Sequence, residues 1–174
     1  MRIVRSFVQD RWYGATGDYV SLVDPCIEDP IAQVSSEGID FGAALRHARE
    51  RGSASLRRMT IGQRAELLGA MAGTLHEARD ELIAVSLENT GTTRRDSKFD
   101  IDGATFVLSH YAELGREIGE RACLLDGEGV RLGRSARFWG QHLWLPLEGA
   151  AVLINAFNFP VWGMLEKLAP TLAA

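Results

Sequence analysis

The sequence predicts an α/β protein in which a small β-meander and a layer of helices precede the first strand–helix unit of a parallel α/β domain. Short apolar runs separated by turns fill residues 1–34, and amphipathic helical stretches follow from about residue 40. Near the C-terminus, the apolar run Ala150–Ile154 leads through a polar turn into the apolar stretch Val161–Ala174. This succession is typical of a strand covered on both faces, followed by its helix.

The composition excludes several classes of function. A net charge of -4 argues against nucleic acid or an anionic membrane as the main partner. No apolar stretch approaches the length of a membrane span, and the first ten residues lack the apolar core of a signal peptide. Cys26 and Cys123 show no CxxC spacing, which favours a reducing, cytoplasmic location. The four histidines show no ligand spacing, so we expect no metal site.

Three short strands are expected at the N-terminus. The runs Arg2–Gln9, Tyr19–Val23 and Ile31–Val34 are rich in residues that favour strands, and turn residues separate them. We expect them to form the β-meander.

Two helix starts carry clear capping signals. Asp40 is a suitable N-cap for a helix from Phe41 to about Arg51, which we expect Gly52 to end. Thr60 and Gln63 match a capping box, in which each side chain bonds the backbone N–H of the other. Apolar residues recur behind this box at the intervals of an amphipathic helix.

Two more helices are expected. One covers Glu77–Asn89 and stops at Thr90-Gly91, and the next runs from about Ile101 to Arg116. Asp100 or Asp102 is the expected cap of the latter helix. A calcium loop around these carboxylates is excluded, because Lys98 and Ser109 would stand where that motif needs Asp and Glu.

The rest of the chain divides into a connection and two strands. The segment 115–133 is rich in glycine and charged residues and is predicted to be a surface connection. Ala136–Leu145 is predicted to be a strand that ends before Pro146, and Ala150–Ile154 a second strand. We expect Pro160 to stand in the first turn of the final helix. The expected division is therefore 1–135, 136–149 and 150–174.

Two motifs that could suggest chemistry fail on inspection. Gly127, Gly129 and Gly133 almost reproduce a dinucleotide fingerprint, but the third glycine is displaced and the flanking strand and helix are missing. Neither cysteine has a base in its local sequence, so both are expected to be packing residues or surface thiols. The chain offers no convincing nucleophile.

Asn158 is the strongest candidate for a functional residue, and it has two interpretations. As an isolated asparagine before Phe159-Pro160, it is most simply the N-cap of the final helix. Alternatively, its amide donates a hydrogen bond to a developing oxyanion at a strand–helix junction. Glu166 and Lys167 are either a solvated charge pair or, if the helix is packed on both sides, residues that face a cleft.

At these residues the sequence resembles the aldehyde dehydrogenase superfamily. Members carry Asn-Phe-Pro at this junction, here Asn158-Phe159-Pro160, although the pair before it is Ala156-Phe157 instead of the common Pro-Trp. The stretch Ile154–Pro170 is similar to the CoA-linked semialdehyde dehydrogenases of phenylacetate and benzoyl-CoA degradation. The stretches 35–40, 90–97 and 100–103 resemble the same branch, so the similarity spans nearly the whole chain.

The resemblance implies roles for individual residues. Asn158 would be the oxyanion-hole amide, and Lys167 matches a family lysine near the active site. Ile154, Asn155, Ala156 and Phe157 would line the nicotinamide-ribose side of an NAD(P)+ site, and Glu166 would face the substrate. The 136–149 strand resembles the family's oligomerisation segment, which implies a homodimeric parent protein. The fold implied is the N-terminal part of an aldehyde dehydrogenase fold, including the start of its Rossmann-like cofactor domain.

The implied activity is oxidation of an aldehyde, expected to be CoA-linked, to the acid. In the family the nucleophilic cysteine and the glutamate base lie C-terminal to this motif, so we expect a fragment that is inactive alone. Two alternatives stay open at this point. One is a CoA-acylating aldehyde dehydrogenase, and the other is a non-catalytic helical assembly module.

Overall fold

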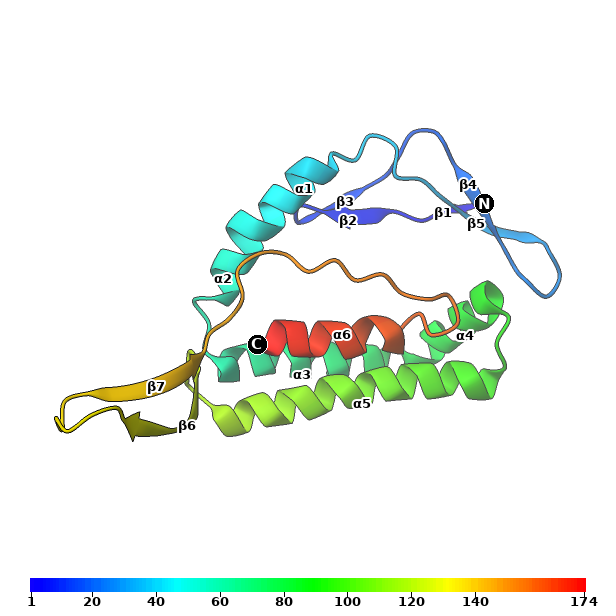
Figure 1. Cartoon of the computed structure of the whole chain (residues 1–174). Coiled ribbons are helices and arrows are strands. Elements are labelled where there is room, and N and C mark those ends of the chain that lie inside the picture. The colour runs from blue at the N-terminus through cyan, green and yellow to red at the C-terminus, as the bar shows by residue number, and fades with distance from the viewer.

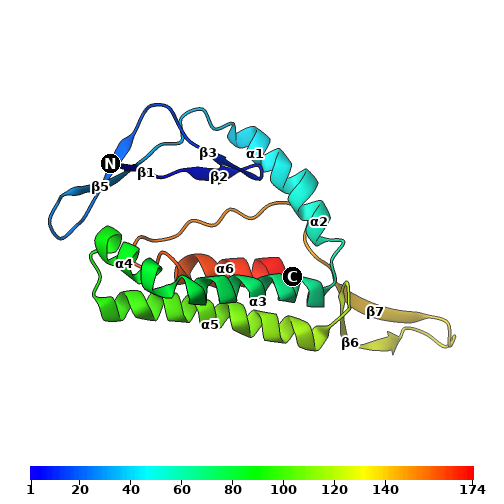
Figure 2. The same cartoon turned by 180° about the vertical axis from the view of Figure 1, so that it is seen from behind.

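Three packed helices form the core of the computed structural model, which describes all 174 residues. They are α3 (Ile61–Glu77), α5 (Arg94–Ile118) and α6 (Trp162–Ala173), which lie side by side in Figures 1 and 2. Small residues allow close approach, since a Cβ atom on Gly115 of α5 would lie 2.7 Å from that of Ala65 on α3. The buried apolar side chains at the centre are Leu68, Ala72, Ala104, Leu108, Ala112, Leu165 and Ala169. With small sheets around these helices, the predicted mixed α/β class is confirmed.

The predicted start of α3 is confirmed in atomic detail. The Thr60 hydroxyl accepts a hydrogen bond from the backbone N–H of Gln63 at 3.2 Å, and the Gln63 side chain accepts one from the backbone N–H of Thr60 at 3.0 Å. Ala65, Leu68 and Ala72 are buried, as their spacing predicts. Periodicity and capping therefore suffice to define this helix.

The helix after the turn at Gly91 begins earlier than predicted. Gly91 ends α4 (Arg79–Thr90) as expected, with a φ of 65° that a glycine adopts without strain. However, α5 starts at Arg94 instead of near Ile101, and its cap is Thr93, whose hydroxyl accepts from the N–H of Asp96. The prediction that Asp100 or Asp102 caps this helix is wrong, because both lie inside it. The charged first turns of α5 conceal the apolar periodicity on which the prediction relied.

The N-terminal strands form two small sheets instead of one meander. They are β1 (Arg2–Ile3), β2 (Ser6–Val8), β3 (Arg11–Tyr13), β4 (Val20–Val23) and β5 (Pro30–Val34). β5 lies between β1, which is parallel to it, and β4, which is antiparallel, whereas β2 pairs with β3. The predictions of β4 and β5 are confirmed, and that of one strand over Arg2–Gln9 is wrong. Positive φ angles at Gln9 and Asp10 turn the chain so that β3 pairs with β2, whereas β1 pairs with β5.

The first helical stretch runs past its predicted end. Asp40 caps α1 (Phe41–His47) as predicted, since its carboxylate accepts from the N–H of Ala43 at 2.8 Å. A π-helical turn, η1 (Ala48–Ser53), and α2 (Ala54–Leu56) follow without a break. Gly52 does not end the helix, because it does not adopt the left-handed conformation through which glycine ends helices.

The hairpin of β6 (Leu124–Arg131) and β7 (Trp139–Trp144) projects from the helical layer in both views (Figures 1 and 2). The prediction of β7 is confirmed. The prediction of a surface connection over 115–133 misses two elements, because α5 continues to Ile118 and β6 lies in the same range. Gly127, with a φ of 68°, lies where the register shifts, and this irregular pairing explains the weak strand signal of β6.

The apolar run before α6 is extended but pairs with no strand. We predicted that Ala150–Ile154 is a strand buried on both faces, and in this structure that prediction is wrong. Val152 is 79% exposed and Ile154 is 85% exposed. Figure 1 shows the segment in orange, running across the helical layer towards α6. A parallel strand exists only when neighbouring strands satisfy the hydrogen bonds of its backbone, and none of the seven strands pairs with this segment.

None of the helices combines the length and apolarity that a membrane span requires.

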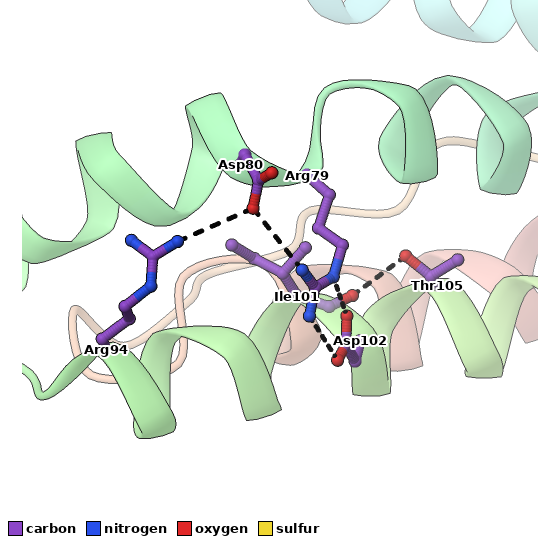
Figure 3. Close-up of polar contacts among 6 residues, drawn as sticks. All are labelled: Arg79, Asp80, Arg94, Ile101, Asp102 and Thr105. Carbon is purple, nitrogen blue, oxygen red and sulfur yellow. Dashed lines mark hydrogen bonds and ion pairs between the residues drawn. The ribbon is translucent and has the colours of Figure 1, made fainter.

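A bidentate ion pair between Arg79 and Asp102 joins α4 to α5. Arg79 Nε and Nη2 donate to the two carboxylate oxygens of Asp102 at 2.6 and 2.9 Å, and Arg79 also lies 3.5 Å from Asp80 (Figure 3). Asp80 in turn lies 3.8 Å from Arg94, near the start of α5. The hydrogen bond from Arg79 lowers the pKa of Asp102 below its ordinary value near 3.8, and the same bond raises the pKa of Arg79.

The Asp102 pair should stabilise the fold only where its carboxylate is ionised. A group whose pKa is lowered by folding contributes stability above its unfolded pKa, and that contribution disappears as the pH falls through the folded pKa. We therefore expect Asp102→Asn to lower the melting temperature at pH 6–7 and to matter progressively less below about pH 4. Glu88→Gln, an exposed α4 residue outside this network, is the control. A melting-temperature difference for Asp102→Asn that stays constant from pH 7 to pH 3 would contradict this account.

Candidate functional site

The turn that leads into α6 carries Asn158 to the surface of the helical layer. Phe157 and Asn158 form the turn, and Phe159 accepts a backbone hydrogen bond from Gly163 at 3.0 Å. Pro160 precedes Val161, the N-cap residue of α6, so it lies just outside the helix and not in its first turn as predicted. Val161 has no polar side chain, and α6 therefore begins without a local cap.

Asp100, on α5, supplies the missing cap. Its two carboxylate oxygens accept hydrogen bonds from the backbone N–H groups of Val161 and Trp162, at 3.1 and 2.8 Å. Asp100 is 2% exposed and lies in the second turn of α5. The prediction that Asn158 is the N-cap of the final helix is therefore wrong, because a carboxylate distant in sequence takes that role. The position at the α6 N-terminus that could attract an anion is filled by this carboxylate.

Asn158 instead lies at an open hollow in front of α6. The hollow measures about 410 Å³, and the side chain of Asn158 is exposed. Rings from two elements form one wall of it: Trp162 lies 5.1 Å from Phe99 of α5 and 6.4 Å from Phe159, measured between ring centroids. The residues that line the hollow are Phe99, Ala156, Asn158, Phe159, Trp162, Gly163, Glu166 and Lys167. A primary amide beside an apolar wall can donate a hydrogen bond to a polar atom of a bound molecule.

Glu166 and Lys167 line the same hollow from the second turn of α6. Lys167 Nζ lies 3.4 Å from a carboxylate oxygen of Glu166 and also donates to the carbonyl oxygen of Gly163. Both side chains are about half exposed. The two interpretations of this pair thus both hold in part, since it is a solvated charge pair that faces a depression.

Of the four residues predicted to line a cofactor, only Ala156 reaches the hollow. Ile154 and Phe157 are exposed. The side-chain oxygen of Asn155 is buried without a hydrogen-bond partner. An unpartnered buried acceptor is uncommon and suits a hydroxyl or amide donor from another group.

Sequence reasoning missed five residues of this region. Four of them line the hollow, namely Phe99, Phe159, Trp162 and Gly163, and the fifth, Asp100, holds the start of α6. The sequence contained a signal for Asp100, because this residue shares the buried face of α5 with Ile101, Ala104 and Leu108. An acidic residue within an apolar stripe indicates a specific internal partner. Both cysteines lie outside the hollow, Cys26 exposed and Cys123 half-buried, in line with the expected surface or packing thiols.

The comparisons with known proteins agree on one family. The sequence model of the aldehyde dehydrogenase family matches residues 12–174. The 3,4-dehydroadipyl-CoA semialdehyde dehydrogenase of Aromatoleum evansii is 43% identical over 169 residues, which are 97% of this chain and 33% of that protein. The 3,6-anhydro-α-L-galactose dehydrogenase of a Vibrio species is 23% identical over this whole chain and 35% of its own length. The chain thus spans about a third of the length of these curated relatives.

Solved structures show the same fold. A 3,6-anhydro-L-galactose dehydrogenase in complex with NAP superposes with a TM-score of 0.79 at 18% identity, over 99% of this chain and 35% of that one. Betaine aldehyde dehydrogenase from Staphylococcus aureus in complex with NAD+ gives 0.76 at 21% identity, over 95% of this chain and 32% of that one. Their match therefore supports the overall fold, including the packing of α3, α5 and α6.

Proposed function

The chain belongs to the aldehyde dehydrogenase family, and from that premise we propose that it forms the N-terminal part of an NAD(P)+-dependent enzyme that oxidises an aldehyde to the acid. The family match and the 43% identity to a CoA-linked semialdehyde dehydrogenase support this activity. Because the chain spans a third of its relatives, the nucleophile and the general base are expected in other parts of such a protein.

Asn158 is the residue of this chain that acts on the reacting atoms. Its exposed position in the hollow, free of any capping role, is the observation that carries the proposal. When a thiolate attacks an aldehyde, the carbonyl oxygen gains negative charge, and the Asn158 amide would donate a hydrogen bond to it. The rings of Phe99 and Trp162 lie on one side of the hollow and would offer an apolar surface to the rest of the substrate.

The segment Ile154–Phe157 would form one side of the cofactor site. The segment leads directly to Asn158, and Ala156 within it lines the hollow, whereas Ile154 and Phe157 are exposed. NAD(P)+ supplies the acceptor for the hydride that leaves the substrate carbon. Since Asp100 already occupies the N-terminus of α6, the phosphates of the cofactor must be bound elsewhere.

We assign the substrate to the CoA-linked semialdehydes formed in aromatic degradation. The 43% identity to the Aromatoleum enzyme, over nearly the whole chain, favours this class. Glu166 faces the substrate in this arrangement, and Lys167 lies beside it at the active site, restrained by the Gly163 carbonyl. Because Glu166 and Lys167 form an ion pair at the rim of the hollow, together they add no net charge there.

The full-length parent protein is proposed to be a cytoplasmic homodimer. The β6–β7 hairpin supports the dimer, because it projects from the core and exposes Leu143, Trp139 and Trp144. Two free cysteines support the location.

Removal of the Asn158 amide should impair the chemical step. In the full-length enzyme we expect Asn158→Ala to lower kcat about 100- to 1,000-fold, since that is the usual effect of losing one oxyanion donor. The measurement is steady-state oxidation of a CoA-linked semialdehyde followed by reduction of the nicotinamide. Asn89→Ala, at an exposed position of α4 outside the hollow, is the matched control. An Asn158→Ala enzyme with unchanged kcat would refute the assigned role.

The 174-residue chain alone should show no aldehyde-dependent reduction of NAD+ or NADP+. Neither of its cysteines lies at the hollow, so it has no thiolate next to Asn158. The check is an absorbance assay of the purified chain with an aldehyde and each cofactor, beside the full-length enzyme as positive control. Turnover by the chain alone would mean that its own residues supply the nucleophile.

A further inference from the structure

Three residues of α5 form a socket that holds the first turn of α6. We infer that Asp100, together with Phe99 and Gly103, is a positioning residue that places the Asn158 amide for the reaction. This inference rests on the proposed role of Asn158 and goes beyond it, because Asp100 touches neither substrate nor cofactor. It acts through the backbone of the turn that carries Asn158.

The carboxylate of Asp100 is committed to this backbone. It receives two hydrogen bonds from successive N–H groups, of Val161 and Trp162, and no cation pairs with it. A buried carboxylate is costly unless its charge is compensated. Here charge-assisted hydrogen bonds and the positive end of the α6 dipole provide the compensation. Displacing the turn would break both bonds at once and leave a buried charge without partners, so the turn has one strongly preferred position.

Gly103 and Phe99 fix the rotation of the same turn. A Cβ atom on Gly103 would lie 2.2 to 2.7 Å from three ring carbons of Trp162, so the indole lies directly against the α5 backbone. The Phe99 ring packs against the indole, 5.1 Å away between centroids. The bonds to Asp100 set how far the first turn of α6 reaches along α5. The slot at Gly103 sets its orientation.

This arrangement explains why Asn158 is available. A helix start needs an acceptor for its free N–H groups, and an asparagine close to it would ordinarily supply one. Because Asp100 satisfies two of these groups from another helix, the Asn158 side chain remains exposed at the hollow. An oxyanion donor must be held within about 0.5 Å of its productive position, and a shift of about 1 Å costs on the order of 100-fold in rate.

The test is a double-mutant cycle in the full-length enzyme. In Asp100→Asn, one acceptor oxygen becomes an NH2 group that faces an N–H donor, so one bond is lost and the turn shifts. We expect kcat to fall about 10- to 100-fold with little change in KM. Combined with Asn158→Ala, the same substitution should cause no further loss, because the amide that it misplaces is gone.

Asp102→Asn is the matched control, since it removes a carboxylate two residues away whose partner is Arg79 and not α6. We expect its kcat to be nearly normal, and its small effect to multiply with that of Asn158→Ala. Gly103→Ala keeps every charge and should lower kcat as Asp100→Asn does, because it displaces Trp162. If Asp100→Asn yields no folded enzyme, Gly103→Ala provides the test of the positioning role. Gly73→Ala, where an added Cβ meets nothing within 4 Å, controls for it.

Each outcome bears on the inference. Loss of kcat in both socket variants, without further loss in the Asn158→Ala background, supports it. Normal kcat in the socket variants, or losses that multiply with that of Asn158→Ala, would overturn it while leaving the proposed function intact. If Asn158→Ala itself keeps full kcat, the proposed role of the amide fails first and the inference falls with it.

Discussion

The hydrogen bonds from the start of α6 to the carboxylate of Asp100 are the interaction on which the rest of this structure depends. They join segments 61 residues apart in sequence, and they connect the helical core to the turn that carries Asn158. Below them, the small residues of α3, α5 and α6 allow the helices to pack closely, so the carboxylate is sealed from water. The turn that carries Asn158 is therefore anchored to the core by one buried acid.

Local signals in the sequence were sufficient for much of the fold. The capping box at Thr60, the cap at Asp40 and the glycine stop at Gly91 are interactions within a few residues, and all three are confirmed. Two failures came where a distant segment decides the outcome. Asp100 resembled the cap of its own helix, and only the packing of α6 against α5 reveals which N–H groups it serves. The missed strand β6 likewise depends on pairing with β7.

The structure brings together four of the seven residues proposed for the site. Asn158, Glu166, Lys167 and Ala156 do meet at one hollow, yet the parallel strand expected to support them is absent from this structure. The absence of a sheet around Ala150–Ile154 does not affect family membership, which rests on the family match and on the 43% identical relative. A segment forms a strand only when a neighbouring strand pairs with it, whereas a match to the family's sequence does not depend on such pairing.

The claim that Asp100 holds the start of α6 can be tested most directly by amide hydrogen exchange on the 174-residue chain. The N–H groups in the first turn of a helix normally lack acceptors and exchange quickly. We predict that the amides of Val161 and Trp162 are protected in the native chain. We also predict that they lose this protection in Asp100→Asn, while the amide of Leu68 in α3 stays protected. Fast exchange of both amides in the native chain, or protection that survives the substitution, would contradict the account.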